Sequence, residues 1–287
     1  MSGFDAHWLA LREAADRRAR ADALTRMLRR ALSGRPHLTV VDLGCGTGSN
    51  LRHVAPQLGG RQHWHLVDTD PKLLDAVPGA VEAWAAEAGD TARRTAPGMV
   101  VEGGSFRAEV TLERRDLAAD PLPLGAADVV TASALLDLVG HAWLDRLVAA
   151  CAAQRAAALL TLSYDGRIAW WPGDTTDATV RARVNRHQQG DKGFGPALGP
   201  HAAQAAAEVF RCAGYEVETA ASDWHLDETE AELQQRLHAE WASAASQVDP
   251  ADSTSVDAWL ARRMDLLAAG TSNLVVGHTD VLALPPS

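Results

Sequence analysis

The sequence predicts an α/β protein built on a doubly wound, mostly parallel β-sheet. Short apolar, β-branched segments alternate with helical segments through residues 36–166, which is typical of consecutive strand–helix–strand units. The run at 38–44 shows no polar alternation, as is usual for strands that are covered on both faces. Glycine and polar residues follow several of these strands directly, at the edge where such sheets bind ligands.

The elements of the first half follow from the residue pattern. Leu, Ala and Trp recur at helical spacing in residues 5–33 and stop at Ser33-Gly34, so a helix is expected before the sheet. A possible break at Pro78-Gly79 interrupts one later helix, and residues 90–105 are rich in turn-forming residues. Strands are predicted at 38–44, 63–68, 107–117, 127–133 and 156–166, and helices at 49–58, 71–89 and 141–154.

Beyond residue 166 the regular alternation ends. A helical piece, TVRARVNRHQQ, is followed by the loop GDKGFGPALGP. Helices are predicted at 201–214, 228–246 and 254–269, and strands at 215–224 and 272–284. We therefore expect an N-terminal helical cap at 1–35 and one domain at 36–287, into which a lid of about 166–200 is inserted.

Composition narrows the functional class. The net charge of −10 argues against a nucleic-acid partner, because phosphates are bound through Lys and Arg. Cys45, Cys151 and Cys212 are too far apart in sequence to form a disulfide framework, which fits a reducing cytoplasm. No apolar run is long enough for a signal peptide or a membrane helix, so a cytoplasmic protein without a membrane partner is expected. The histidines show no metal-ligand spacing, and no metal is predicted.

Three features indicate a nucleoside-containing cofactor. Gly44, Gly46 and Gly48 follow the first strand, where glycine lets the backbone approach a ligand closely. Asp68 ends the next strand and can bind the hydroxyls of a ribose, and Asp116 ends the third and can bind an adenine amino group. A dinucleotide-binding oxidoreductase is the alternative, but Ser49 stands where that fingerprint has its third glycine.

Together these segments resemble the class I S-adenosylmethionine-dependent methyltransferases. VVDLGCGTG, LVDTDPKLL, RRDLAADPLP and ADVVTASALLDLV are similar to the first four motifs of that family. The resemblance covers about residues 36–165 and the strands at 215–224 and 272–284. It implies a Rossmann-like sheet of seven strands with an antiparallel last strand, a helical lid, S-adenosyl-L-methionine as cofactor and S-adenosyl-L-homocysteine as product.

The resemblance also implies where the cofactor is bound. The glycine turn would hold the methionine part above Asp42, while Asp68 and Asp116 would hold the ribose and the adenine. The residues expected to contact the cofactor are Asp42, Gly44, Cys45, Gly46, Gly48, Asp68, Thr69, Asp116, Leu117 and Ser133.

The family has no universal catalytic residue, so the acceptor site is sought outside these motifs. Tyr164, Asp137 and His187 are candidate catalytic residues, with His187 a possible proton acceptor. Asp137 could instead cap the following helix, and His187 could belong to a solvated helix end.

Five further residues are expected to bind the acceptor. Two adjacent tryptophans can wall a pocket or anchor a lid onto apolar surface. The polar segment NRHQQGDK can grip an acceptor or form a solvated helix end and a surface loop. The residues in question are Trp170, Trp171, Asn185, Arg186 and Lys192.

The function expected from these observations is methyl transfer from S-adenosylmethionine to the oxygen or nitrogen of a small polar molecule. One alternative is a nucleic-acid or protein methyltransferase, against which stand the acidity and the sequence SALLD after the fourth strand. The other is a catalytically silent protein that binds S-adenosylmethionine and acts through interaction. The acceptor molecule and the oligomeric state leave no signature in the sequence.

Overall fold

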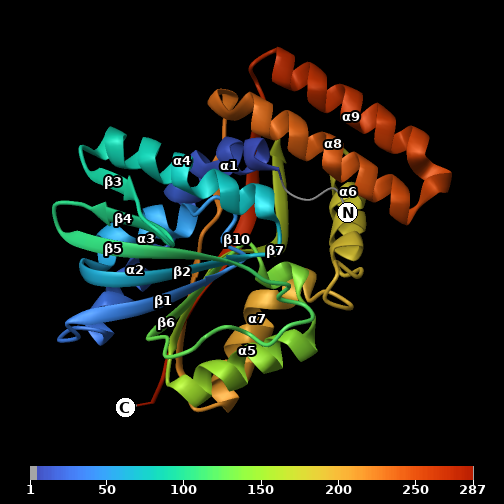
Figure 1. Cartoon of the computed structure of the whole chain (residues 1–287). Coiled ribbons are helices and arrows are strands. Elements are labelled where there is room, and N and C mark those ends of the chain that lie inside the picture. The colour runs from blue at the N-terminus through green and yellow to red at the C-terminus, as the bar shows by residue number, and fades with distance from the viewer. Residues whose placement is uncertain (1–4, 287) are drawn as a thin grey trace.

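One ten-stranded sheet organises the chain, in the order β3-β4-β5-β2-β1-β6-β7-β10-β8, with β9 paired to β10 (Figure 1). This computed structural model describes residues 5–286; residues 1–4 of the expected cap and residue 287 of the expected domain lie outside the described residues. The five central strands, β5, β2, β1, β6 and β7, are parallel. From β1 the chain goes outward to β2 and β5 on one side and later to β6 and β7 on the other, so the predicted doubly wound α/β class is confirmed.

The strands have the following bounds: β1 His37–Leu43, β2 Gly60–Asp68, β3 Thr91–Arg94, β4 Gly98–Glu102, β5 Phe106–Arg114, β6 Val129–Ser133, β7 Ala157–Trp171, β8 Glu216–Ala221, β9 Trp224–Leu226 and β10 Asn273–Leu284. The α-helices are α1 Ala6–Ala19, α2 Asp22–Ala31, α3 Ser49–Leu58, α4 Pro71–Ala88, α5 His141–Gln154, α6 Asp177–Gln188, α7 Ala202–Cys212, α8 Ala231–Val248 and α9 Ser253–Ala268. Short 3₁₀ turns include η1 at Leu136–Leu138 and η2 at Gly199–His201.

Helices cover both faces of the parallel strands. α2, α3 and α4 bury their apolar sides against one face, and α5 and α7, below the sheet in Figure 1, cover the other. Fully buried Val40 and Val41 point to opposite faces of β1, which explains why this strand has no polar alternation.

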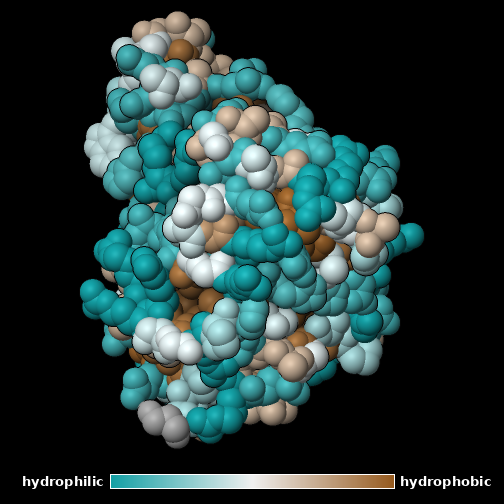
Figure 2. All heavy atoms as spheres, turned by 60° about the vertical axis from the view of Figure 1, so that its left-hand side comes forward, coloured by the Kyte–Doolittle hydropathy of each residue, from teal (hydrophilic) through white to brown (hydrophobic). Residues whose placement is uncertain are grey.

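A third hydrophobic cluster lies outside these two layers. It joins the far ends of β7 and β10 to α1, α6, α8 and α9, which lie at the top and right of Figure 1. The face of the molecule shown in Figure 2 is mostly hydrophilic, with small separate apolar areas. Among the described residues, Trp171 is the exposed large hydrophobic side chain, at 55%.

The sheet has more strands than the expected seven. Residues 90–105 form the hairpin β3–β4, and β4 pairs antiparallel with β5. The turn-forming residues connect the strands of this hairpin. Met99, Val100 and Val101 are buried at the edge of the sheet, which makes 98–102 a strand. β9 is the third addition, because the expected strand at 215–224 is divided into β8 and β9, both paired with β10.

Two predicted helices also differ from their expected form. The helix at 5–33 is two helices, α1 and α2, which meet at Arg20 and Ala21 because Arg20 turns inward and is buried. The predicted break at Pro78 does not occur, and α4 continues through it. Leu74, Val77 and Val81 lie on one buried side of α4 before and after the proline, so packing holds both halves in line.

The strand predicted to end at residue 166 continues to Trp171. Asp165-Gly166 reads as a turn, but β10 pairs with β7 on both sides of it, with register shifts in between. Gly166 has φ +89, and a Cβ there would lie 3.1 Å from the Asn185 amide nitrogen. The extension carries the chain from the sheet into the helical lid, which contains α8 and α9 as well as the expected segment at 166–200.

Candidate functional site at the carboxyl edge of the sheet

The glycine turn lies between β1 and α3. Gly44, Gly46 and Gly48 all have positive φ (+66, +55 and +83), a conformation that side chains disfavour. The backbone N–H of Gly44 donates to the Val67 carbonyl at 2.9 Å, which fixes the turn to the adjacent β2. The turn therefore presents bare backbone at the position where the order of the strands reverses.

Two buried carboxylates flank this turn. Asp68, at the end of β2, accepts from the Gly46 N–H at 2.8 Å and from the Asp70 N–H at 3.0 Å. Asp42 lies beneath the turn and accepts from Asn50 Nδ2 at 2.8 Å and Thr131 Oγ1 at 2.7 Å through one oxygen, Oδ1. Its other oxygen, Oδ2, is buried without a partner, and burial raises the pKa of Asp42 to about 6.

The other expected cofactor residues follow β2, β5 and β6. Asp116 and Thr69 are exposed, and the Asp116 carboxylate accepts from the Ala118 N–H at 2.9 Å. Leu117 is buried, with its carbonyl accepting from Trp143 Nε1 at 2.7 Å. Cys45 is buried within the turn, and burial raises the pKa of its thiol. The ten residues of this set thus lie on or near one edge of the sheet.

The helix α1 lies over the glycine turn. A Cβ placed on Gly46 would lie 2.8 Å from Leu9 Cδ1, so Leu9 occupies the space directly against the bare backbone. Glu13 holds α1 to α3 through Arg52 at 2.8 and 2.6 Å. A cavity between α1, α3 and α4 measures about 30 Å³, whereas small-molecule sites measure about 300–1,000 Å³.

A nucleoside cofactor fits the groups on this edge but not the space left in this conformation. The unpartnered Asp42 oxygen, the positive-φ glycines and the Asp68 carboxylate are the donors and acceptors that such a molecule requires. Because Leu9 covers Gly46, α1 has to move before a ligand of that size can contact the turn.

The strand arrangement and one solved structure decide the fold family. Starting from the side of β5, the parallel strands and the antiparallel β10 and β8 reproduce the topology that the resemblance implies. The protein YcgJ from Bacillus subtilis matches with a TM-score of 0.50 and 13% identity over 93% of this chain and 100% of that chain. The fold is that of the class I methyltransferases. At such identity the similarity shows the fold alone.

Two further solved structures resemble the chain more weakly. An S-adenosylmethionine-dependent methyltransferase from Thiobacillus denitrificans, in complex with S-adenosyl-L-homocysteine, has a TM-score of 0.43 at 16% identity, covering 98% of each chain. A second one, from Geobacter sulfurreducens and in complex with the same molecule, has a TM-score of 0.42 at 16% identity, covering 93% of this chain and 92% of that chain. No protein-family model and no curated protein matches the sequence.

A buried arginine joins the cap to the sheet beneath this site. Arg20 donates to Asn50 Oδ1 at 2.5 Å, to Thr161 Oγ1 at 3.0 Å and to Ser133 Oγ at 3.1 Å. Because Asn50 also binds Asp42, the cap and the glycine turn share one hydrogen-bond network. The expected cofactor residue Ser133 is thus engaged by Arg20.

On the other side of α1 lies a second group of polar and aromatic side chains. Arg12 and Asp16, one turn apart on α1, form a two-bond ion pair at 2.9 and 3.1 Å. Trp224 of β9 donates from Nε1 to Asp16 at 3.0 Å and lies 4.8 Å from the guanidinium of Arg12. His278 lies between the rings of Trp224 and Tyr164, and burial lowers its pKa to about 4.

Two of the candidate residues meet in this group. The Tyr164 hydroxyl donates to Asn185 Oδ1 at 2.6 Å, and Asn185 Nδ2 donates to the Gly166 carbonyl at 3.0 Å. Burial, together with the negative charges of Asp165 and Asp137, raises the pKa of Tyr164. Tyr164 is therefore a neutral hydrogen-bond donor at the carboxyl side of the parallel part of β7.

Asp137 lies in η1, just beyond β6. It is 8% exposed, its Oδ1 has no partner, and burial raises its pKa to about 6. The alternative that it caps the next helix is wrong: α5 begins after Gly140 and has no side-chain capping bond. The loop that follows α6 lies against this turn, with the Leu198 N–H donating to the Val139 carbonyl at 2.7 Å.

The other polar candidates on α6 and its loop lie apart from Tyr164. His187 is two residues beyond Asn185, so it points to another side of the helix, where its Nε2 lies 3.3 Å from Gln247 of α8. Burial and the charge of Lys192 lower the pKa of His187. Arg186 is exposed. Lys192 lies on the loop after α6, where its Nζ is 3.4 Å from His187 Nδ1.

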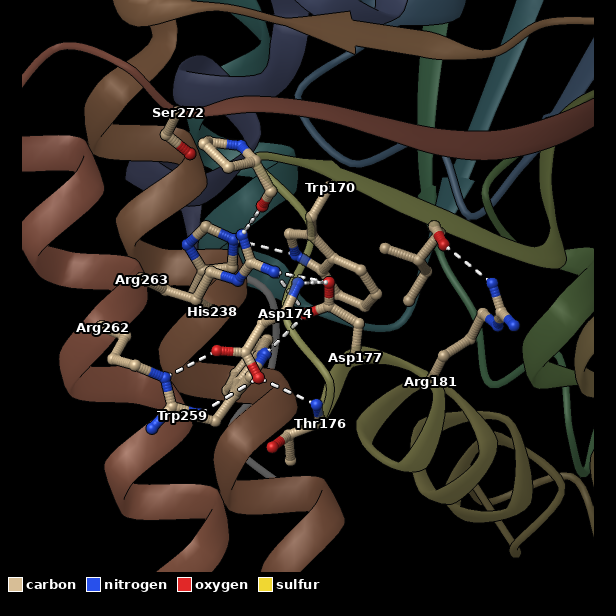
Figure 3. Close-up of polar contacts among 12 residues, drawn as sticks. Trp170, Asp174, Thr176, Asp177, Arg181, His238, Trp259, Arg262, Arg263 and Ser272 are labelled. Atoms are coloured by element: carbon tan, nitrogen blue, oxygen red, sulfur yellow. Dashed lines mark hydrogen bonds and ion pairs between the residues drawn. The ribbon is translucent and has the colours of Figure 1, made fainter.

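The two tryptophans are separated, because adjacent residues of a strand point to opposite faces. Trp170 is buried in the lid, where its Nε1 donates to His238 Nε2 at 3.1 Å and its ring packs on that of Trp259 (Figure 3). The ring of Trp241 packs against it as well. Trp171 is exposed. The two rings therefore do not form one wall of a pocket. Trp170 instead packs within the apolar core of the lid, as the alternative interpretation expects.

Among the described residues, seven buried side-chain atoms have no partner. Asp42 Oδ2, Asp137 Oδ1 and Ser163 Oγ lie near the carboxyl ends of β1, β6 and the parallel part of β7. The other four, in Trp8, Arg183, His238 and Arg263, belong to the lid and to the helix packed on it. Buried polar atoms are nearly always paired, so the free Asp42 and Asp137 oxygens are positions where a ligand can complete the bonding.

Sequence reasoning missed Arg12, Asp16, Asn50 and Trp224. The spacing LREAAD places Arg12 and Asp16 four residues apart, on one side of a helix, and was the available signal for the pair. Asn50 lies eight residues after Asp42 in the glycine-rich segment, and this proximity was its available signal. Trp224 had none, since its partner Asp16 is distant in sequence.

A larger cavity, about 180 Å³, lies at the opposite edge of the sheet and is lined partly by Arg29, Arg35 and Arg61. The carbonyl ends of α2 and α3 also point to this edge, so the arginines complement those helix ends there. Within residues 5–286, no three His, Cys, Asp or Glu side chains are grouped as metal ligands, and no helix is long and apolar enough to cross a membrane.

Proposed function

We propose that the protein transfers a methyl group from S-adenosylmethionine to a small polar acceptor. The observation that carries the proposal is the bare, positive-φ glycine turn between the buried carboxylates of Asp42 and Asp68, at the point where the strand order reverses. The acidity of the chain supports a small acceptor over a polyanion.

In this proposal the bound cofactor supplies an electrophilic methyl group on a sulfonium. Gly44, Gly46 and Gly48 receive its methionine part, Asp68 its ribose hydroxyls, and Asp116 and Leu117 its adenine. Asp42, directly below the turn, offers its free oxygen to a hydrogen-bond donor.

The group formed by Arg12, Asp137, Tyr164 and Asn185 is the proposed acceptor site. Methyl transfer is an in-line displacement, so its main requirements are alignment and exclusion of water. The buried Tyr164–Asn185 bond orients both side chains, and α1 covers the edge from solvent. His187, two residues along α6 from Asn185, would need the loop to rearrange before it could accept a proton there.

One observation favours a second candidate, an interaction protein that has lost the cofactor. Leu9 fills the space against Gly46, and a cavity between α1, α3 and α4 measures about 30 Å³. A protein that never binds the cofactor would keep this closed form, whereas an enzyme would have to displace α1.

Titration calorimetry separates the two candidates. We expect micromolar binding of S-adenosylmethionine and S-adenosylhomocysteine and none of NAD. Asp68→Ala should weaken binding by about tenfold or more, because a hydrogen bond to a charged group contributes about 1.5–3 kcal/mol. Asp75→Ala, at an exposed carboxylate on α4, is the matched control and should bind as the wild type does. Failure of the wild type to bind either sulfur compound would favour the silent protein.

A further inference from the structure

The buried Asp137 carboxylate has no counter-ion of its own. Its Oδ1 is unpartnered, and no Lys, Arg or His nitrogen lies within 4 Å of it among the described residues. Removing a carboxylate from water without a partner costs several kcal/mol, so such a group is retained only where something completes it.

The two cations that lower the pKa of Asp137, Arg12 and Lys192, have other partners. Arg12 is neutralised by Asp16, which also accepts from Trp224. Lys192, on the loop after α6, is half-buried and its Nζ lies 3.4 Å from His187 Nδ1. Both lower the pKa of Asp137, but burial outweighs them. The site thus keeps one negative charge that nothing on the chain pairs directly.

Tyr164 does not pair with Asp137 either. Its hydroxyl hydrogen is donated to Asn185, so that hydrogen is not available to the carboxylate. The turn η1, which carries Asp137, packs against β7, which carries Tyr164. A buried carboxylate without a counter-ion suits an ammonium group, which supplies both the opposite charge and hydrogen-bond donors.

We infer that the acceptor is a small amine, and that Asp137 recognises it by pairing with its ammonium group. This inference rests on the proposed function, because it places the amine beside the carboxyl ends of β6 and β7, where the acceptor would lie. Asp137 acts here as the group that selects the substrate; the atom that receives the methyl group is a separate matter.

Three probes of equal length test the charge preference: n-butylamine, n-butanol and butyrate. Binding of each is measured by calorimetry on the full chain saturated with S-adenosylhomocysteine. We expect the amine to bind at least about tenfold more tightly than the other two, since a charged hydrogen bond contributes about 1.5–3 kcal/mol. In Asp137→Asn, which keeps the shape of the side chain, this preference should disappear.

Two controls show whether a negative result comes from this inference or from the proposed function. The affinity for S-adenosylhomocysteine should be unchanged in Asp137→Asn, which separates failure of this inference from failure of the proposed function. Asp75→Asn, at an exposed carboxylate on α4, should retain the amine preference. Equal binding of amine and alcohol, no binding of the amine, a preference for butyrate, or an amine preference that survives Asp137→Asn would each overturn the inference.

Discussion

Arg263 and Arg262 are neighbours on α9 with opposite surroundings, and replacing each by alanine tests how the lid is stabilised. Arg263 is 1% exposed; its Nη1 donates to the Pro172 carbonyl at 2.6 Å, and its Nη2 pairs with Asp177 of α6 (Figure 3). Arg262 pairs with Asp174 at 2.6 Å, but its side chain is 49% exposed.

The loss at Arg263 follows from what it leaves behind. Asp177 keeps two donors, Trp259 Nε1 at 2.7 Å and the Asp174 N–H at 2.8 Å, but it faces the interior without its cation. Breaking a buried pair costs about 3–5 kcal/mol, because the remaining charge is uncompensated. The guanidinium also lies 5.5 Å from the ring centre of Trp170 and 5.9 Å from that of Trp259, contacts that are lost as well.

Urea unfolding followed by tryptophan fluorescence is a suitable assay, since Trp170, Trp241 and Trp259 all lie in the lid core. We expect Arg263→Ala to lower the free energy of unfolding of the lid by about 3–5 kcal/mol. Arg262→Ala should stay near the wild type, because water replaces the exposed pair. Equal losses in the two variants, or a loss below about 1 kcal/mol at Arg263, would refute the reasoning.

Two further predictions concern pH and the glycine turn. Burial lowers the pKa of His238 to about 4, below the ordinary 6.5. As the pH drops, the unfolded state therefore binds the proton before the folded state does. The free energy of unfolding consequently falls between about pH 6.5 and pH 4. His238→Gln should remove up to about 3 kcal/mol of that fall, measured as the difference between urea midpoints at pH 7 and 4.5; an unchanged slope would contradict it. Gly46→Ala should cost at least about 1–2 kcal/mol, because φ is +55 and the new Cβ meets Leu9, and calorimetric melting should show part of the loss recovered by Leu9→Ala. Gly79→Ala, in open space on α4, is the control and should not destabilise; recovery absent from the double variant would count against the Leu9 contact.

The parallel core was predictable because its signals are local. The apolar runs of β1, β2 and β6 and the glycine turn each lie within a few residues, and the strand–helix alternation then fixes the doubly wound order. The carboxyl edge followed from the same rule, which is why Asp42, Asp68 and Asp116 fall on it.

What the sequence did not reveal depends on contacts between distant segments. The strand β7 passes Asp165-Gly166 only because β10 pairs with it, more than a hundred residues later. The sequence predicts that Trp170 lines a pocket, but its ring is enclosed by Trp241 of α8 and Trp259 of α9. The closure of the glycine turn by Leu9 likewise depends on how α1 folds back across the sheet, which no local pattern encodes.

The strand pair β7–β10 also determines which part of the molecule can move. Because β10 pairs with β7 from Ala158 to Trp171, the helical lid is attached to the sheet by a two-stranded ribbon and cannot swing without breaking its ladder. The helix α1, by contrast, is joined in the chain to α2 through Arg20 and Ala21, and it is held in place by side-chain contacts such as Glu13–Arg52 and Asp16–Trp224. Access to the carboxyl edge therefore depends on the position of α1. An affinity tag fused before α1 would hinder its movement, whereas a tag after Pro286, which Arg155 holds at the far edge of the sheet, would not.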